Sequence, residues 1–301
     1  MFCFNYNTNM NFGLNFDNIQ RVAYLGPRGS YTEMALDYFA NKFELRAFPA
    51  EQRTIRQVIE CVDENTDTLG VLPVENSVEG AVRETLDNLI RLKNQNIRIL
   101  AEVIMPIEHC LLARTTEFYS ITGGIISHPQ ALAQCQNFIH TEMPYRIETI
   151  DASSTAEAAR SLVNYNLTYA AIGSKKTADI YNLNILKENI NDDKSNCTRF
   201  ILIGDCETDF VKGMQSSLAF STENKSGALF DVLEIFKNNK INLSYISSRP
   251  SKHNFGEYIF IVNFDGHSSK EQILKTVGEM RKKTTFLRFL GSYEIDVVKS
   301  V

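Results

Sequence analysis

The stretch RVAYLGPRGSYTEMA, residues 21–35, joins a short apolar run to a glycine-containing turn and to the start of an amphipathic segment. The apolar run predicts a strand at 21–25, and the periodic apolar residues from 31 to 43 predict a helix. Ser30, followed three residues later by Glu33, is typical of a helix N-terminus. The turn fits neither G-x-x-x-x-G-K-S/T nor G-x-G-x-x-G, so it does not predict a nucleotide site.

The strand-turn-helix order continues outward from this stretch. Further strands are predicted at 69–73, 97–105, 109–113, 124–127, 146–150, 170–172 and 200–204, and helices at 78–93, 129–140 and 155–165. Short strands that alternate with longer helices favour a parallel α/β architecture.

The pattern changes near residue 210. Strands are predicted at 217–221, 241–248, 257–264 and 286–297, and helices at 227–238 and 269–282. This βαββαβ order is the ferredoxin-like arrangement. Charged and small residues interrupt the apolar pattern at 208–215, which we interpret as a linker between two domains.

Composition excludes several classes of protein. The 301 residues are 44% hydrophobic and 22% charged, with a net charge of −5, as in an ordinary globular protein. A mildly acidic chain without a basic block is a poor candidate for binding nucleic acid, and no apolar run approaches the ~20 residues that cross a bilayer. The six cysteines show no C-x-x-C spacing, so we interpret them as thiols in a reducing compartment, the cytoplasm. Residues 1–20 lack the features of a secretory signal and are interpreted as a disordered or weakly packed leader.

Four predicted helices begin just after a strand and carry capping residues. They are Ser30 with Glu33, Asn76 with Glu79, Ser154 with Glu157, and His128 before Pro129. Helix N-termini bind anions, and ligands of open α/β sheets bind at the carboxyl ends of strands. One such cap is most often structural only, whereas four together favour a site for a small anionic ligand.

Thr198 and Arg199 form the second candidate group, at the start of the last strand of the first domain. A hydroxyl beside a guanidinium can donate to a leaving oxygen while the guanidinium holds a carboxylate. The alternative is a loop threonine that caps its own backbone and a surface arginine. The sequence contains no H-E-x-x-H, G-x-S-x-G or carboxylate cluster with metal spacing, so neither a metal nor an organic cofactor is expected.

From about residue 21 to 298 the chain resembles the prephenate dehydratase family. The motifs are YLGPRGSYTEMA (24–35), GVLPVENSVEGAV (70–82), ISHPQALAQC (126–135), SSTAEAA (153–159), and a final signature from Tyr181 through Asp192 to Thr198-Arg199-Phe200. The resemblance implies a two-lobed catalytic domain, like a periplasmic binding protein, at 21–207. Lobe 1 comprises about 21–101 and 187–207, and lobe 2 about 102–186. It also implies a ferredoxin-like ACT regulatory domain at 216–301.

The family reaction converts prephenate to phenylpyruvate, with loss of water and carbon dioxide, in phenylalanine biosynthesis. The resemblance implies that Thr198 is the catalytic residue. Residues expected to contact substrate are Arg199, Phe200, Asn76, Ser77, Glu75, Gly29, Ser30, Tyr31, Ser153, Ser154, Thr155 and His128.

The ACT region departs from the family pattern at one sensor element. The turn from Asn224 through Gly227, Ala228 and Leu229 matches the family's phenylalanine-binding turn, where glycine lets the backbone approach the ligand. The second element reads Ser247-Ser248-Arg249-Pro250, with Ser247 in place of the family's glutamate and Tyr245 where a basic residue is usual. Feedback by L-phenylalanine is expected, and a purely structural ACT domain is the alternative. Side-by-side pairing of ACT domains implies a homodimer or homotetramer.

Two other functions stay open at this stage. An arogenate dehydratase would use the same mechanism on a substrate that carries an amino group. A non-catalytic binding regulator would keep the two-lobed fold without chemistry, although Thr198 within its full signature opposes it. A secreted solute-binding protein is opposed by the missing signal peptide and by the predicted sensing domain.

Overall fold

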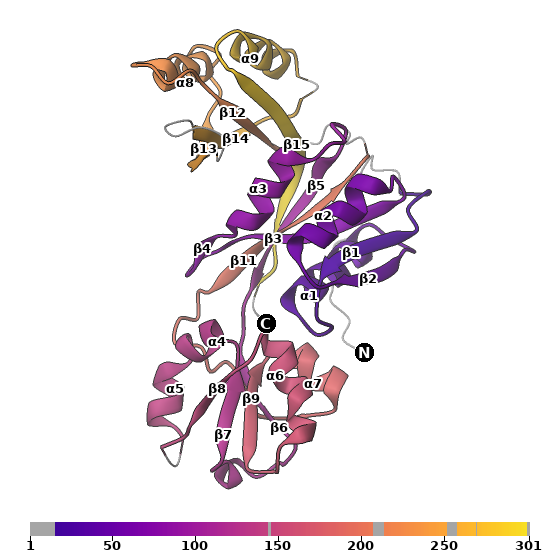
Figure 1. The fold of residues 1–301 in the computed structure, drawn as a ribbon, viewed down its shortest axis with the longest axis vertical. Coiled ribbons are helices and arrows are strands. Elements are labelled where there is room, and N and C mark those ends of the chain that lie inside the picture. Colours follow the sequence, from indigo (N-terminus) through magenta and orange to yellow (C-terminus); the bar gives the residue numbers. More distant parts are fainter. Residues whose placement is uncertain (1–15, 144–145, 207–213, 252–257, 269, 300–301) are drawn as a thin grey trace. The chain divides into compact units, whose positions relative to one another are not determined.

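The computed structural model describes residues 16–143, 146–206, 214–251, 258–268 and 270–299 (Figure 1). The chain divides into two compact units. The larger consists of Ile19–Gln95, Ala101–Gly204 and the chain end from Asp296, and the smaller contains Asn96–Leu100 and Asp205–Ile295. Most of the predicted leader, and the predicted linker up to residue 213, lie outside the described residues.

The first lobe of the larger unit is a mixed sheet covered by helices. Its strand order is β5-β11-β3-β1-β2, and β1 is parallel to both β2 and β3, while β11 is antiparallel to β3. The strands are β1 (Arg21–Leu25), β2 (Phe48–Gln52), β3 (Thr68–Asn76), the short β4 (Gly80–Ala81), β5 (Arg98–Pro106) and β11 (Cys197–Gly204). The helices are α1 (Tyr31–Lys42), α2 (Ile55–Glu64) and α3 (Arg83–Arg91).

The second lobe is a five-stranded sheet in the order β10-β6-β9-β7-β8. Strands β7, β8 and β9 are parallel, and apolar clusters form around Phe138 and Leu132 and around Leu162 and Ala158. Its strands are β6 (Cys110–Ala113), β7 (Gly124–Ser127), β8 (Thr149–Asp151), β9 (Tyr169–Gly173) and β10 (Asn184–Lys187). Its helices are α4 (Pro129–Ala133), α5 (Gln136–Thr141), α6 (Thr155–Ser161) and α7 (Lys175–Tyr181), with short 3₁₀ turns at Phe118–Ser120 and Leu162–Asn164.

Two connecting segments, 107–109 and 188–196, join the lobes and are bonded to each other. The backbone N–H of Ile107 donates to Asn196 O at 2.9 Å, and that of Ile190 donates to His109 O at 2.9 Å. Asn191 adds two side-chain bonds, because its Nδ2 donates to Ile107 O and its Oδ1 accepts from the His109 N–H at 2.6 Å. The crossing between the lobes is therefore a two-stranded, hydrogen-bonded connection.

The smaller unit has the expected βαββαβ order, and its antiparallel strands lie in the order β13-β14-β12-β15. Leu218, Phe220, Phe236 and Phe264 belong to its buried core. Gly291 is required where β15 passes residues 96–100, because a Cβ there would lie 2.3 Å from Ile99 O. The elements are β12 (Gln215–Ser221), α8 (Ala228–Asn238), β13 (Leu243–Pro250), β14 (Tyr258–Asp265), α9 (Glu271–Arg281) and β15 (Phe286–Val297).

Several element predictions were wrong. The helix predicted at 78–93 begins only at Arg83, because residues 80–81 pair with β3 instead. The helix predicted at 129–140 is divided between α4 and α5, and the sheet of the first lobe is mixed rather than parallel. The sequence analysis missed β2, β4, β10, α2 and α7, although apolar Ile55, Val58, Ile59 and Val62 follow the helical spacing of α2.

Candidate active site

Thr198 and Asn76 lie opposite each other where β11 pairs with the end of β3. The antiparallel register places Thr198 beside Asn76, and Arg199 beside Glu75. Because successive side chains of a strand point to opposite faces, Thr198 and Asn76 share one face of the sheet, and Arg199 and Glu75 share the other. The two residues of the Thr-Arg pair therefore have different surroundings.

The amide of Asn76 is held in one orientation by the backbone. Its Oδ1 accepts hydrogen bonds from the N–H groups of Val78 and Glu79, both at 3.0 Å. Its Nδ2 lies 2.9 Å from Thr198 Oγ1 and 2.8 Å from Asn196 Oδ1. Asn76 was predicted to cap a helix; that prediction was wrong, because its capping-type contacts close the turn between β3 and β4.

The hydroxyl of Thr198 is placed to donate a proton. The residue is 8% exposed, and its Oγ1 accepts the hydrogen bond from Asn76. Within the described ranges, no protein group accepts the proton of this hydroxyl. A hydrogen bond into Oγ1 polarises the O–H bond and strengthens it as a donor.

Three neighbouring side chains extend this cluster to the second lobe. Ser77 Oγ accepts from the Cys197 N–H at 3.0 Å and donates to Asn196 Oδ1 at 3.4 Å. Asn196 Nδ2 donates to Gln134 Oε1 at 2.9 Å, and Gln134 lies at the end of α4. The sequence analysis did not single out Asn196 or Gln134, although Gln134 lies within the ISHPQALAQC motif and Asn196 lies two residues before Thr198.

His109 and Tyr31 complete the same set of contacts. His109 Nε2 lies 3.1 Å from Gln134 Oε1, and its Nδ1 lies 3.1 Å from the Tyr31 hydroxyl. Burial lowers the pKa of His109 to about 4, so the imidazole is neutral near pH 7, and burial raises the pKa of Tyr31. The hydrogen-bonded cluster thus joins four predicted site residues, Thr198, Asn76, Ser77 and Tyr31, to three that the sequence analysis did not select.

On the opposite face of β11, two carboxylates hold Arg199. Its Nε and one terminal nitrogen contact the two oxygens of Glu102 at 2.7 and 2.9 Å, and its other terminal nitrogen contacts Glu75 at 2.7 Å. Glu102 is 1% exposed. This paired fork-to-carboxylate geometry fixes the guanidinium, and the local charge of the three side chains sums to −1.

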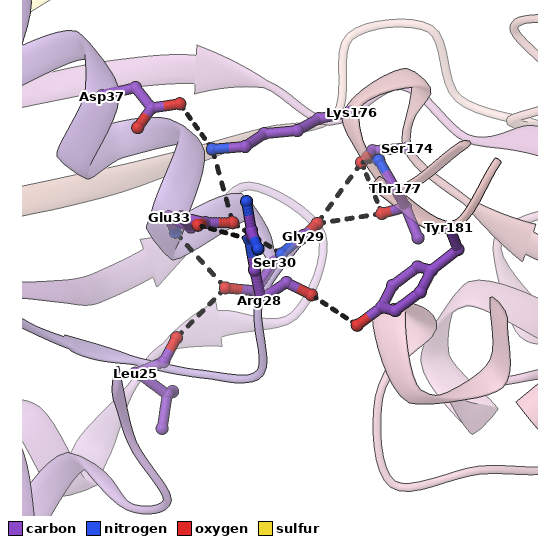
Figure 2. A network of polar contacts seen from close by, with 10 residues as sticks. All are labelled: Leu25, Arg28, Gly29, Ser30, Glu33, Asp37, Ser174, Lys176, Thr177 and Tyr181. Carbon is purple, nitrogen blue, oxygen red and sulfur yellow. Dashed lines mark hydrogen bonds and ion pairs between the residues drawn. The ribbon is translucent and has the colours of Figure 1, made fainter. Parts of the chain in front are cut away.

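The turn before α1 contacts the second lobe, as Figure 2 shows. Gly29 has a φ of +90°, and its carbonyl accepts from Thr177 Oγ1 at 2.9 Å, while its N–H donates to Glu33 at 2.6 Å. Ser30 caps α1 as predicted. Lys176 Nζ lies 3.4 Å and Arg28 Nε 3.9 Å from Glu33, so with the Gly29 N–H the carboxylate at this helix start already has three partners.

The other predicted substrate contacts lie at helix starts of the second lobe. Ser154 caps α6, with Thr155 as its first residue and Ser153 exposed before it, and His128 caps α4. Within the residues that the structure describes, none of these side chains is hydrogen-bonded to Thr198. Phe200 is 2% exposed and packs in the core of the first lobe.

The structure gives no sign of a metal site or a membrane segment in its described parts. No group of three or more His, Cys, Asp or Glu residues there could hold a metal ion. None of the helices described is long and apolar enough to cross a bilayer.

Comparison with known proteins now identifies the larger unit. A family model described as Prephenate dehydratase matches residues 22–208, and an ACT domain model matches residues 216–280. The chain belongs to the prephenate dehydratase family. The match covers the whole Thr198 cluster and both connecting segments, and the ferredoxin-like unit is the ACT domain that the sequence predicted.

Relatives within the prephenate dehydratase family support this assignment. A protein named prephenate dehydratase from Methanocaldococcus jannaschii is 40% identical over 91% of this chain and 98% of its own length. A chloroplastic arogenate dehydratase/prephenate dehydratase from Arabidopsis thaliana is 36% identical over 92% of this chain and 73% of its own. The crystal structure of prephenate dehydratase from Arthrobacter aurescens with L-Phe is 31% identical, with a TM-score of 0.81 over 91% of this chain and 89% of that one.

The predicted sensor residues of the ACT domain lie in two elements. Gly227 has a φ of +81° and precedes α8, which begins with Ala228 and Leu229, while Asn224 is exposed in the preceding turn. The other four residues belong to β13; in that strand Arg249 is buried, Ser247 is half-buried, and Ser248 and Pro250 are exposed.

Proposed function

We propose that the chain converts prephenate to phenylpyruvate, with release of water and carbon dioxide. The observation that carries this proposal is the Thr198 hydroxyl, which Asn76 holds through its oxygen while its proton stays available. A donor in this state suits a reaction in which hydroxide departs from a ring carbon.

The chemistry needs placement and a hydrogen-bond donor rather than a strong acid. The carbon–carboxylate bond breaks, and its electron pair completes the aromatic ring while the carbon–oxygen bond breaks on the other side. Thr198 donates a hydrogen bond to the departing oxygen, which leaves as hydroxide and becomes water by taking a proton from solvent, so Thr198 keeps its own proton. A well-placed donor of this kind contributes ~10² to 10³ in rate.

Neutral donors make up the cluster around Thr198. Gln134 Oε1 already accepts two bonds, so its NH₂ group is a donor that no described protein group uses. Ser153, Ser154, Thr155 and His128 remain predicted contacts at helix starts, and Gly29 and Ser30 remain predicted contacts of the first lobe. A site that solvates a carboxylate poorly would favour its loss, because the charged ground state is destabilised.

The carboxylates around Arg199 bear on its predicted contact with substrate. A guanidinium already paired with Glu102 and Glu75 has less to offer an incoming carboxylate. We therefore propose that Arg199 and Glu75 mainly hold the start of β11 in register with β3, and that direct substrate contact is the secondary role.

Turnover by the purified chain tests the proposed function. Prephenate and arogenate are supplied separately to the wild type, Thr198→Ala and Thr198→Ser. We expect phenylpyruvate from prephenate, a loss of at least ~10²-fold in Thr198→Ala, and a smaller loss in Thr198→Ser, which keeps the hydroxyl. Phenylalanine from arogenate alone would change the substrate and keep the mechanism. Normal turnover by Thr198→Ala would overturn the assignment, and no turnover by a folded wild type would favour a binding regulator.

We further propose that L-phenylalanine binds the ACT domain and lowers turnover. The ACT domain and the related Arthrobacter structure that contains L-Phe support this. Gly227, at a positive φ where a Cβ would meet nothing within 4 Å, leaves its backbone accessible to a ligand. Phenylalanine added to the turnover assay tests it.

We also propose a homodimer or homotetramer and a cytoplasmic location. In support of the first, β13 is an outer strand of the ACT sheet, and Ile246 on it is 47% exposed. Unpaired thiols such as Cys61, Cys110 and Cys135 suit a reducing compartment. Light scattering and cell fractionation test these two proposals.

A further inference from the structure

In the hydrogen-bonded cluster around Thr198, the donor and acceptor role of each side chain can be assigned in turn, beginning at Asn76. The backbone N–H groups of Val78 and Glu79 both donate to Asn76 Oδ1, so the Asn76 NH₂ group must face Asn196 and Thr198. Backbone N–H groups are donors only. The orientation of the first amide is therefore set by the backbone.

The orientation of each later amide follows from the one before. Asn196 must present Oδ1 to the Asn76 NH₂ group, which leaves its own NH₂ to donate to Gln134 Oε1 at 2.9 Å. Gln134 then faces His109 Nε2 with the same oxygen, at 3.1 Å. An oxygen at this position accepts only, so the ring nitrogen of His109 must carry a proton.

The proton on Nε2 determines the role of the other nitrogen of the His109 ring. A neutral imidazole carries one proton, so a proton on Nε2 leaves Nδ1 as an acceptor. The Tyr31 hydroxyl donates to Glu108 O at 2.8 Å and also lies 3.1 Å from Nδ1, so the two acceptors share its one proton. His109 is 2% exposed, and burial lowers its pKa, so the neutral form predominates near pH 7.

We propose that His109, in its neutral Nε2–H form, is a positioning residue that holds the Gln134 amide with its NH₂ group directed to the substrate. The Gln134 oxygen, which can only accept, sets the histidine tautomer, and the Tyr31 hydroxyl lies against Nδ1 on the other side of the ring. Without the Nε2–H donor, Gln134 loses one of two bonds to Oε1, and its amide can turn over and present an acceptor to an anionic substrate. The assignment of a substrate contact to Gln134 rests on the proposed function.

His109 and Asn196 lie in the two segments that connect the lobes, and the hydrogen bonds between these segments hold both residues in place. We call the chain of hydrogen-bonded side chains from Tyr31 through His109, Gln134 and Asn196 to Asn76 the relay. The backbone N–H of His109 is bonded to Asn191, and its carbonyl accepts from Ile190, so the ring is fixed to the second connecting segment. The relay starts in α1 of the first lobe at Tyr31, passes through both connections and returns to β3 and β11.

A first experiment reports the tautomer without any turnover. Nitrogen-15 NMR of histidine side chains in the intact chain, with the His109 signal assigned by its loss in His109→Gln, distinguishes the two neutral tautomers and the imidazolium. We expect a neutral ring with the proton on Nε2 near pH 7, and a shift toward the other tautomer in Gln134→Leu, which removes the acceptor. An Nδ1–H ring or an imidazolium in the wild type would overturn the proposal, even if prephenate were not the substrate.

A second experiment measures the consequence for prephenate turnover. His109→Phe keeps the ring volume and removes the donor, and we expect kcat to fall about tenfold, as for the loss of one hydrogen bond. His109→Gln places an amide nitrogen near the Nε2 position, and we expect kcat within about threefold of the wild type. His140→Phe, at an exposed position of α5, is the matched control and should leave kcat unchanged.

A double-mutant cycle separates positioning from a general structural role. In a Gln134→Leu background, His109→Phe should cost almost nothing further, because the residue through which it acts is absent. Full additivity of the two losses, or equal losses in His109→Phe and His109→Gln, would overturn the proposal. If His109→Phe does not fold, His109→Leu, which also removes the donor, takes its place in the same cycle. Absence of turnover in the wild type would instead count against the proposed function, while the NMR result would still stand.

Discussion

The amide nitrogen of Asn76 lies 2.9 Å from the hydroxyl oxygen of Thr198, across the antiparallel pairing of β3 with β11. The contact joins residues 122 positions apart in the chain. Because Asn76 Oδ1 is occupied by two backbone N–H groups, the asparagine can only donate to Thr198. This direction leaves the threonine proton for the substrate.

Asn76→Asp should reverse this direction. The substituted carboxylate keeps the two bonds from Val78 and Glu79 but offers an acceptor to Thr198, whose hydroxyl would then donate to that carboxylate instead of to the leaving group. We expect kcat on prephenate to fall by ~10² to 10³, the loss typical of one missing donor.

The same chemical change away from the site provides the control for Asn76→Asp. Within the described residues, the half-buried Asn88 on α3 donates to Glu84 O at 2.8 Å, away from the Thr198 cluster. Asn88→Asp should keep kcat near that of the wild type. Equal losses in the two variants would show that the added charge, and not the direction of the Asn76 bond, matters.

Glu102→Gln should affect stability much more than substrate binding. Glu102 is 1% exposed and makes two contacts with Arg199, on the face of β11 opposite Thr198. Glu75 still pairs with Arg199 in the variant, so the change weakens a hydrogen bond between charged groups, which typically contributes about 1.5–3 kcal/mol to the free energy of unfolding. We expect a lower urea midpoint, with KM for prephenate changed less than about threefold.

The KM of Glu102→Gln for prephenate decides whether Arg199 holds the start of β11 or binds a substrate carboxylate directly. If Arg199 binds a substrate carboxylate directly, loss of its Glu102 partner frees the guanidinium and KM should fall markedly. A urea midpoint equal to that of the wild type would contradict the structural role.

Gly29→Ala tests the turn that touches the second lobe. Gly29 has a φ of +90°, and a Cβ there would lie 3.3 Å from Thr177 Oγ1, the group that donates to Gly29 O. The positive φ alone costs an alanine about 1–2 kcal/mol. Gly80→Ala is the matched control, because Gly80 has a φ of +81° with nothing within 4 Å of the added Cβ. We expect Gly29→Ala to lose more unfolding free energy than Gly80→Ala, and equal losses would show that crowding against Thr177 is unimportant.

Local sequence rules predicted the caps at Ser30, Ser154 and His128, because a cap depends only on residues within one turn. The same rules misplaced Asn76. An asparagine whose side chain accepts from the N–H groups two and three residues later has the same local sequence before a helix as before a tight turn. Pairing of β3 with the distant β11 determines that a turn, and not a helix, follows Asn76.

The relay residues could not be found from the sequence for a related reason. Asn196 contacts Asn76 from 120 positions away, and His109 contacts Tyr31 from 78 positions away. No periodic pattern encodes such distances, which follow from strand register and from the connections between lobes. Thr198 was identified because its neighbours resemble a family motif, while the opposite orientation of Arg199 became evident only with the strand pairing.

Burial of neutral His109 should make the stability of the larger unit depend on pH. The folded-state pKa of about 4 lies below the ordinary value, so the unfolded chain binds a proton first as the pH falls. This contribution to stability is complete above the ordinary histidine pKa and is lost as the pH falls toward 4, amounting to about 2 kcal/mol between about pH 7 and about pH 5.

Urea unfolding of the wild type and His109→Gln at both pH values isolates this effect. Paired carboxylates contribute equally to both proteins, so the difference between their pH dependences reports His109 alone. We expect the variant to lose about 2 kcal/mol less than the wild type on acidification. Parallel pH profiles would mean that the histidine is already protonated in the folded chain.

The phenylalanine response should depend on the backbone at Gly227. A Cβ at this position meets no atom within 4 Å, so Gly227→Ala adds a methyl group to the space beside the backbone where the ligand is expected, at a φ of +81° that alanine disfavours. We expect the inhibition constant for phenylalanine to rise about tenfold, the equivalent of about 1.4 kcal/mol of binding free energy. Gly278→Ala, in the middle of α9 and also without neighbours within 4 Å, is the matched control and should keep the response.

Ser247→Glu, which restores the residue usual in the family, should strengthen inhibition if this element contacts the ligand. Inhibition that is equal in all four proteins would place the phenylalanine site elsewhere, and its absence in all four would identify the ACT domain of this chain as structural only.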